Sequence, residues 1–160
     1  MTENELERYM RLHYKSVYAV ALCCCKNPDD SYDIAQEVFL KLYTSDTRFT
    51  DDEHVKAWLL RSAVNKATDY VRSHWYRFSL PLDAASGKFS DAPSDSGYDL
   101  MRIIMKLAKN DRVALYLHYC EGYPVTELST MLGISEQALR SRLRRGKARL
   151  RKLIESERSE

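Results

Sequence analysis

Residues 124–152, PVTELSTMLGISEQALRSRLRRGKARLRK, constrain the fold more than any other part of this 160-residue chain. Apolar residues recur at helical spacing on both sides of a Gly-Ile-Ser turn, where Gly133 can adopt a positive φ and Ser135 can cap the second helix. That second helix carries eight Lys and Arg residues, with no acid between Glu136 and Glu155. Solvated helices ordinarily mix Glu with Lys, so the pattern predicts a helix-turn-helix that lies against phosphates in a major groove.

A polar segment over residues 79–97 divides the chain. It is rich in Ser, Asp, Pro and Gly and has neither helical nor strand periodicity. Because so long a structureless segment is uncommon inside one compact domain, we expect a flexible linker between domains at 1–78 and 98–160. The alternative is a disordered insertion within a single domain.

Charge is unevenly shared among these three parts. Lys and Arg number 11 against 12 Asp and Glu in 1–78, 1 against 3 in 79–97, and 13 against 8 in 98–160. The last part therefore carries a net charge of +5 within a chain of net charge +2. This asymmetry predicts a polyanionic partner for the C-terminal domain alone.

Both flanking parts have helical periodicity, so we predict an all-α fold of two small domains. Helices are expected over 3–25, from Asn27 onward, over about 51–77, 100–108 and 111–120, and in the helix-turn-helix. The expected core faces consist of Met10, Tyr14, Val17, Ala21, Cys24, Ala35, Val38, Phe39, Leu42, Val55, Trp58, Leu59, Ser62, Ala67, Tyr70, Val71, Val113, Tyr116, Leu117 and Cys120.

Several functional classes find no support in the sequence. No apolar run approaches the roughly 18 residues of a membrane span, and the acidic start does not suggest a signal peptide, so we expect a cytoplasmic protein without membrane insertion. Nucleophilic triads, paired carboxylates and phosphate-cradling Gly loops are not evident, so we expect no catalytic site, no cofactor and no enzyme activity. Cys23, Cys24 and Cys25 lack metal-ligand spacing; we interpret them as reduced apolar side chains, with a redox sensor as the alternative.

Two clusters in the N-terminal half combine residues that can bind a partner. Spacings of three and four place four polar residues on the solvent side of the second helix: Asp33, Gln36, Glu37 and Lys41. The third helix and the loop before it combine aromatic side chains with Asn and Arg, which can stack on and hydrogen-bond to unpaired bases. Its members are Arg48, Phe49, Trp58, Asn65, Asp69 and Arg72. Taken singly, the first cluster could be a solvated face and Trp58 a core residue.

Together with the helix-turn-helix, these segments resemble the extracytoplasmic-function (ECF) sigma factors, the small bacterial specificity subunits of RNA polymerase. DIAQEVFLKLY (33–43) resembles the region 2 helix that binds core polymerase. FTDDEHVKAWLLRSAVNKATDYVR (49–72) resembles the segment that melts promoters and reads the minus-ten element, and residues 115–150 resemble region 4. The motifs occur in this order across a linker and cover nearly the whole chain, so the resemblance is specific.

The resemblance implies a two-domain sigma factor, with region 2 at 1–78 and region 4 at 98–160, that binds core RNA polymerase, promoter DNA and an anti-sigma factor. The residues implied to contact the polymerase clamp, or to support that contact, are Asp33, Gln36, Glu37, Phe39 and Lys41. Those implied for minus-ten DNA are Arg48, Phe49, Trp58, Asn65, Asp69 and Arg72, with Phe49 and Asn65 bordering the pocket for a flipped base. Those implied for the minus-thirty-five element are Ser135, Gln137, Arg140, Ser141, Arg144, Arg145 and Lys147.

The alternative function is a helix-turn-helix repressor or activator that binds DNA without polymerase. It accounts for residues 124–152 but leaves the polar pattern over 33–41 and the run from Trp58 to Asn65 without a role. The sigma-factor hypothesis accounts for all three.

Overall fold

The computed structural model describes residues 1–78 and 96–159. Within these ranges every regular element is a helix, and the chain separates into two compact units, Met1–Gly87 and Lys88–Glu160. The predicted all-α fold of two small units is therefore confirmed. Residues 79–95 of the expected linker lie outside the described residues.

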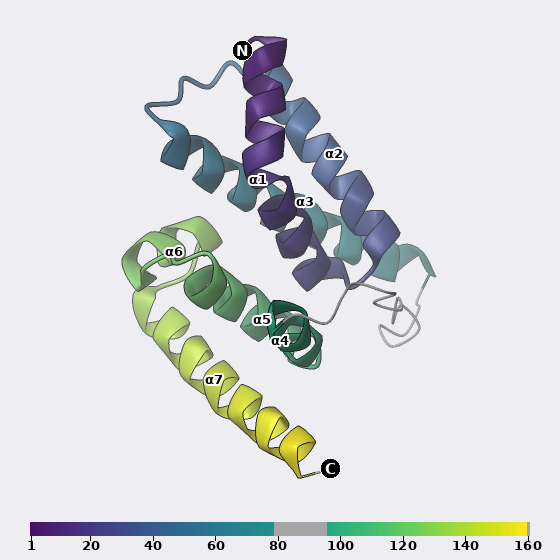
Figure 1. Cartoon of the computed structure of the whole chain (residues 1–160), viewed down its shortest axis with the longest axis vertical. Helices are drawn as coiled ribbons and strands as arrows, with labels where there is room; N and C mark the ends of the chain where they lie inside the picture. The colour runs from purple at the N-terminus through teal and green to yellow at the C-terminus, as the bar shows by residue number, and fades with distance from the viewer. Residues whose placement is uncertain (79–95, 160) are drawn as a thin grey trace. The chain divides into compact units, whose positions relative to one another are not determined.

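The first unit is a bundle of three helices, each of which packs against the other two (Figure 1). They are α1 (Glu3–Cys25), α2 (Pro28–Thr44) and α3 (Asp52–Phe78). The Thr2 hydroxyl accepts the backbone N–H of Glu5 at 3.1 Å, and the side-chain oxygen of Asn27 accepts that of Asp30 at 3.0 Å. Helix α2 thus starts at Pro28, where the capping Asn and the Pro predicted it.

The predicted core of this unit is confirmed where the helices meet. The residues that are at most 2% exposed include Val17, Ala21, Cys24, Ala35, Val38, Phe39, Leu42, Val55, Leu59 and Ala67. Those that are only half-buried are Met10, Tyr14, Trp58, Ser62, Tyr70 and Val71. Leu60 and Ala63 are also fully buried, because α3 contacts two helices and so buries a wider arc than a single apolar stripe.

The second unit places its longest helix against three others (Figure 1). Its elements are α4 (Ser96–Ile104), α5 (Lys109–Leu115), a π-helical turn η2 (Tyr116–Cys120), α6 (Val125–Leu132) and α7 (Glu136–Arg158). Helix α4 starts four residues before the predicted Leu100, because Ser and Asp, which suggested a linker, also suit the first turn of a helix.

A buried cation closes the turn between α4 and α5. Arg112 is only 5% exposed, and its guanidinium donates a hydrogen bond to the carbonyl of Leu107 at 2.7 Å. The hydrogen bond satisfies a carbonyl that the helix ladder leaves open at this point. This role was not predictable from the sequence, since Arg is rarely buried.

The prediction that Cys120 faces the core is wrong, because its side chain is exposed. In η2 the N–H of Glu121 bonds to the carbonyl of Tyr116, five residues earlier, at 3.1 Å. A π-helical turn contains more residues than an α-turn, so spacings of three and four stop predicting which residues face inward. Tyr116 and Leu117 remain buried, whereas Cys120 turns outward.

Candidate nucleic-acid and protein interfaces

The buried side of α2 determines which of its residues are available to a partner. The core residues of this helix, at most 3% exposed, are Ile34, Ala35, Val38, Phe39 and Leu42. Asp33, Glu37 and Lys41 lie on the opposite side and are exposed. Gln36 is half-buried and forms a hydrogen bond with the hydroxyl of Tyr14 on α1. The predicted polar patch therefore forms one side of α2.

Phe39 does not belong to this exposed patch. Its side chain is 2% exposed, and its ring stacks against that of Tyr14 with 6.3 Å between the centroids. Tyr14 also meets the ring of Tyr32 edge-on at 6.4 Å. Phe39 can therefore support the patch from the core but cannot contact a partner directly.

Large apolar side chains are exposed on the same side of α2. Leu40 is 62% exposed, Tyr32 53% and Tyr43 38%. An exposed Leu between two Tyr residues indicates a protein-binding surface when charged groups surround it. We call this surface the α2 face, and its members are Tyr32, Asp33, Gln36, Glu37, Leu40, Lys41 and Tyr43. Sequence reasoning missed the apolar members, although their spacing of eight and three was visible once the buried side was assigned.

Charged residues of the α2 face are tied to α3. The Glu37 carboxylate pairs with the Lys66 ammonium at 3.1 Å, and the Lys41 ammonium lies 5.9 Å from the centre of the Trp58 ring. Further along, Tyr70 is hydrogen-bonded to Asp30, and burial together with that bond raises the pKa of Tyr70 to about 12. These contacts orient α2 and α3 along their shared edge.

Phe49 and Trp58 are brought together at the start of α3. The Phe49 ring meets those of Trp58 and His54 edge-on, with centroid distances of 5.9 and 5.0 Å. The loop is ordered by hydrogen bonds from the N–H of Thr50 to Nδ1 of His54, at 3.1 Å, and from the N–H of His54 to Oδ1 of Asp51, at 2.8 Å. The result is a half-buried aromatic cluster at the end of an exposed polar helix surface.

The remaining residues predicted for minus-ten DNA extend along α3 from this cluster. Trp58, Asn65, Asp69 and Arg72 follow spacings of seven, four and three, which place them in one line along the helix. Asn65, Asp69 and Arg72 are exposed, as is Arg48 in the preceding loop. Asn65 lies about 10 Å along the helix axis beyond Trp58. We call Trp58, Asn65, Asp69 and Arg72 the α3 row.

The helix-turn-helix forms as predicted from its turn chemistry. Gly133 adopts φ 68° at the end of α6, and the N–H of Ile134 bonds back to the carbonyl of Ser129 at 3.1 Å. The Ser135 hydroxyl then accepts the N–H of Ala138 at 3.1 Å and caps α7. Ser135 is itself exposed, so its hydroxyl caps α7 and can still donate a hydrogen bond to a partner.

Close packing orients α7 against α5. Leu139, Leu143 and Gly146 are its buried residues. A Cβ atom added at Gly146 would lie 3.0 Å from Cδ1 of Leu115, a separation that leaves no room for a larger side chain. Gly146 therefore allows the two helices to approach closely, which the apolar pattern of the sequence did not reveal.

The side of α7 opposite this contact carries Gln137, Arg140, Ser141 and Arg144, which we call the α7 outward row. Gln137, Arg140 and Arg144 are exposed, and Ser141 is half-buried. Arg140 lies 3.8 Å from the Glu136 carboxylate, and Arg144 is 3.4 Å from the Ser141 hydroxyl. These long contacts leave both guanidinium groups accessible to a groove.

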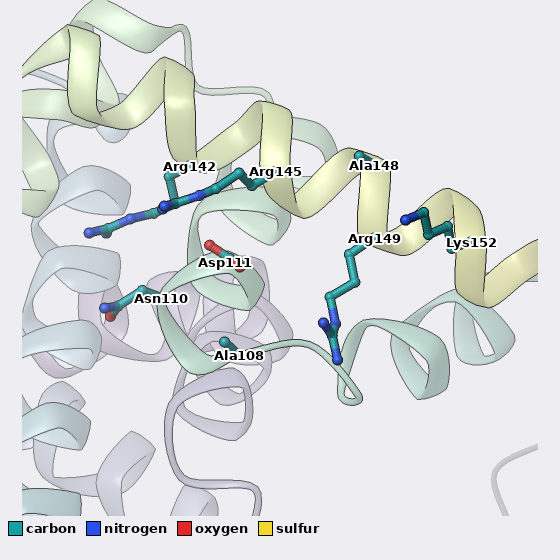
Figure 2. A pocket seen from close by; sticks show the side chains of 8 residues that line it. All are labelled: Ala108, Asn110, Asp111, Arg142, Arg145, Ala148, Arg149 and Lys152. Atoms are coloured by element: carbon teal, nitrogen blue, oxygen red, sulfur yellow. The ribbon is translucent and has the colours of Figure 1, made fainter.

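Two further predicted residues lie on opposite flanks of α7. The Lys147 ammonium lies 5.9 Å from the centre of the Tyr119 ring, which is 55% exposed and belongs to η2. Arg145 lies on the other flank, beside the first turn of α5 (Figure 2). Sequence reasoning missed Tyr119, because the face it occupies follows from the π-helical turn.

Cys23, Cys24 and Cys25 are buried, as their interpretation as apolar side chains predicts. Cys23, Cys24 and Cys25 are at most 7% exposed. Burial raises the pKa of the Cys25 thiol, which lies 3.1 Å from the Ser31 hydroxyl. Among the described residues, no three His, Cys, Asp or Glu side chains are grouped to hold a metal ion. The described helices also include none that is long and apolar enough to cross a membrane.

Comparison with known proteins gives the same assignment for both units. Residues 9–77 match Sigma-70 region 2, and residues 98–150 match Sigma-70, region 4. The ECF RNA polymerase sigma factor SigM of Mycobacterium tuberculosis (strain ATCC 25618 / H37Rv) is 26% identical over 149 residues, covering 92% of this chain and 76% of that protein. The RNA polymerase sigma factor CarQ of Myxococcus xanthus is 32% identical over 128 residues, covering 76% of this chain and 73% of that protein.

A solved structure has the same fold. The sigma factor RpoE from Bartonella quintana, crystallised in complex with the anti-sigma factor NepR, superposes with a TM-score of 0.78 at 18% sequence identity. The match covers 94% of this chain and 97% of that one.

Proposed function

Because the chain belongs to the extracytoplasmic-function group of RNA polymerase sigma factors, we propose that its two units recognise core polymerase and promoter DNA through the three surfaces defined above. The chain binds core RNA polymerase and directs promoter-specific initiation. We assign core polymerase to the α2 face and minus-ten DNA to the α3 row with Phe49 and Arg48. We assign the minus-thirty-five element to the α7 outward row with Ser135, Arg145 and Lys147. Residues 1–78 and 98–160 are then region 2 and region 4, joined through 79–97.

The observation that carries this proposal is the α2 face. An exposed Leu40 between two tyrosines, beside Asp33 and Glu37, suits a protein partner rather than a polyanion. A repressor that binds DNA unaided could use such a surface to dimerise, but it leaves the α3 row without a role. Sigma factors are initiation factors without a reaction of their own, so we infer that this chain has no enzyme activity and acts in the cytoplasm with polymerase.

An anti-sigma partner is also part of the proposal. Two solved structures of the same fold are complexes: the sigma factor RpoE with the anti-sigma factor NepR, and CnrH with the cytosolic domain of CnrY. In this chain the exposed α2 face and the α7 outward row are the surfaces such an inhibitor would have to cover to block polymerase or DNA.

The function itself is tested by capture of purified core polymerase on the tagged full chain, followed by run-off transcription from a genomic library. The interface is tested by charge exchange between Glu37 and Lys66, which pair in the free protein. We expect Glu37→Lys to weaken polymerase capture about tenfold, since charge pairs at interfaces contribute up to a few kcal/mol.

The matched control is the double variant Glu37→Lys, Lys66→Glu, which restores the internal pair with reversed polarity. If Glu37 contacts polymerase, the double variant remains defective. Full recovery of capture in the double variant would show that Glu37 acts only within the bundle, and the assignment of Glu37 to the interface would be wrong.

A further inference from the structure

The loop before α3 is held in place by a histidine of the helix. The backbone N–H of Thr50 donates a hydrogen bond to Nδ1 of His54 at 3.1 Å, and the Thr50 hydroxyl lies 3.4 Å from the same nitrogen. The backbone N–H of His54 in turn donates to the Asp51 carboxylate at 2.8 Å. His54 is half-buried, and its ring meets that of Phe49 edge-on at 5.0 Å. One side chain therefore contacts both the loop backbone and the ring of Phe49.

The contact with Thr50 determines which nitrogen of the His54 ring carries the proton. A backbone N–H can only donate, so Nδ1 accepts, and the neutral ring is then protonated at Nε2. His118 in the second unit has the opposite arrangement. Its Nδ1 lies 2.7 Å from the carbonyl oxygen of Tyr123, so in the neutral ring this Nδ1 carries the proton. His54 thus presents a hydrogen-bond donor, Nε2–H, that the loop does not use.

This Nε2–H group is available to a ligand. Within residues 1–78 and 96–159, the ring of His54 forms hydrogen bonds with Thr50 alone. Its Nε2 is not among the side-chain atoms of these residues that are buried without a partner, so solvent reaches it. A donor that is open to solvent at the edge of an aromatic cluster can orient a ligand that packs against the rings.

His54 also lies in line with the α3 row. It precedes Trp58 by four residues and Asn65 by eleven, and both spacings return to the same side of a helix. The line of the row therefore extends one turn, about 6 Å, toward the loop. Phe49 lies beside this end of the row, because its ring meets those of both His54 and Trp58. A DNA strand whose unpaired bases follow the row would bring one base against Phe49 and within reach of His54.

A hydrogen-bond donor at this point can distinguish bases where the aromatic rings cannot. Stacking on Phe49 or Trp58 favours every base, because each base has a π-face. Cytosine, thymine and guanine carry a carbonyl oxygen that can accept from Nε2–H, whereas adenine carries an amino group and no carbonyl. A base that offers no acceptor at this point leaves the donor unpaired, which lowers its affinity.

We propose that His54 reads the unpaired minus-ten base that packs against Phe49, with Nε2–H donating to a carbonyl oxygen of that base. Nδ1 holds the loop at Thr50 at the same time, so the two nitrogens of one ring have separate tasks. The site then prefers a base that carries a carbonyl oxygen to adenine. The inference rests on the proposed function, in which the α3 row binds the minus-ten strand.

The test uses holoenzyme reconstituted from core polymerase and the full chain, with a promoter recovered by run-off transcription. Partly single-stranded promoter DNA carries each of the four bases in turn at each unpaired minus-ten position, and fluorescence anisotropy measures its affinity. At one position we expect the wild-type chain to bind a base with a carbonyl oxygen about fivefold more tightly than adenine, which is the effect of about one hydrogen bond.

Two variants separate the tasks of the two ring nitrogens. In His54→Asn the amide oxygen can replace Nδ1 as the acceptor for Thr50, but the side chain is too short to place a donor at the position of Nε2. We expect this variant to bind the adenine strand as the wild-type chain does and to lose the fivefold preference. In His54→Gln the longer amide supplies the donor but leaves Thr50 without its acceptor. We expect weaker binding of all four strands, with the preference retained.

His118→Asn is the matched control, because it makes the same change at a half-buried histidine of the second unit. It should leave every minus-ten preference unchanged, and all three variants should still capture core polymerase, which shows that the first unit is folded. Retention of the wild-type preference by His54→Asn would overturn the proposal. So would an equal loss of affinity for all four bases in His54→Asn, since that would indicate a contact with the DNA backbone.

Failure of the proposed function would give a different result. The wild-type holoenzyme would then bind the promoter strand no more tightly than a strand of scrambled sequence, and no variant would need to be compared. That outcome would also overturn the role of His54, whereas tight binding of the promoter strand together with an unchanged preference in His54→Asn would overturn the role of His54 alone.

Discussion

The α2 face and the exposed surface of α7 both lie opposite a buried side of their helix. They differ in whether their charged side chains have partners within the protein. On the α2 face, Glu37 is paired with Lys66 and Lys41 lies over Trp58, while Leu40 supplies exposed apolar area. On α7, eight cations lie between Glu136 and Glu155. Four of them have no carboxylate within 4.0 Å among the described side chains: Arg142, Arg145, Arg149 and Lys152.

The difference shows how each surface can select its partner. A protein interface gains affinity mainly from well-packed apolar groups, with charges that set orientation. DNA binding gains affinity from released counterions, so unpaired cations are favourable and binding weakens steeply with salt. Polymerase capture should therefore be much less salt-dependent than duplex binding. The first two predictions below each test one side of this contrast, and the other two test the stability of the unit that carries α7.

The largest effect is expected for Leu40→Glu on the α2 face. A carboxylate at the centre of an apolar contact should cost at least about 2 kcal/mol, or 30-fold, in affinity for core polymerase. The matched control is Leu12→Glu on α1, where the leucine is similarly exposed, at 56% against 62%. Competition with the wild-type chain for core polymerase measures both, and equal effects of the two variants would remove Leu40 from the interface.

Next in size is Arg140→Ala on the α7 outward row. If Arg140 reads a base, the variant should lose about 1–3 kcal/mol of binding free energy on the cognate minus-thirty-five element. It should lose little on elements altered at the base that Arg140 reads. Transcription from a set of promoters mutated at single positions measures the difference. A uniform loss on every sequence would make Arg140 a phosphate contact rather than a base contact.

Gly146→Val should destabilise the second unit alone. The added side chain meets Leu115, which is 1% exposed, and overpacking of this kind costs about 1–3 kcal/mol. Thermal unfolding followed by amide exchange should show lower protection in α5 and α7 and unchanged protection in α1–α3. Destabilisation of both units together would show that they do not fold independently.

The smallest effect concerns pH. Hydrogen bonds from Arg102 and Lys106 lower the pKa of the Glu157 carboxyl below its ordinary value of 4.5. A lowered folded-state pKa means that stabilisation is present above pH 4.5 and is lost as pH falls through the folded value. Glu157→Gln should therefore slightly reduce the free energy of unfolding at pH 7 and make it fall less steeply as the pH is lowered below 4.5. If the free energy of unfolding falls equally steeply in the wild-type chain and the variant, Glu157 does not contribute to the acid dependence.

Local sequence signals predicted much of the fold because they act over a few residues. Asn27 with Pro28, and Gly133 with Ser135, each determine a helix boundary through their own backbone and side-chain chemistry. The apolar positions of α2 were likewise predicted, since one regular period runs through the whole helix. The outward side of α7 followed from the same reasoning.

Features that depend on neighbouring helices were not predictable in this way. The exposure of Cys120 depends on the π-helical turn, the burial of Arg112 on an open carbonyl at Leu107, and the need for glycine at 146 on the approach of Leu115. A hollow beside α7 is lined by Asn110 and Asp111 of α5 and by Arg142 and Arg145 of α7, which are thirty or more positions apart in the sequence. No periodicity within one helix contains that information.

The different environments of the four thiols also make the native chain a ready substrate for selective labelling. Cys23, Cys24 and Cys25 are enclosed by the three-helix bundle, whereas Cys120 is exposed at the end of η2. A maleimide dye applied to the folded protein should therefore attach at a single position, Cys120, which follows Tyr119 directly and precedes Pro124 in the chain. Without any substitution, that dye would report by fluorescence when the helix-turn-helix meets a promoter or is covered by an inhibitor.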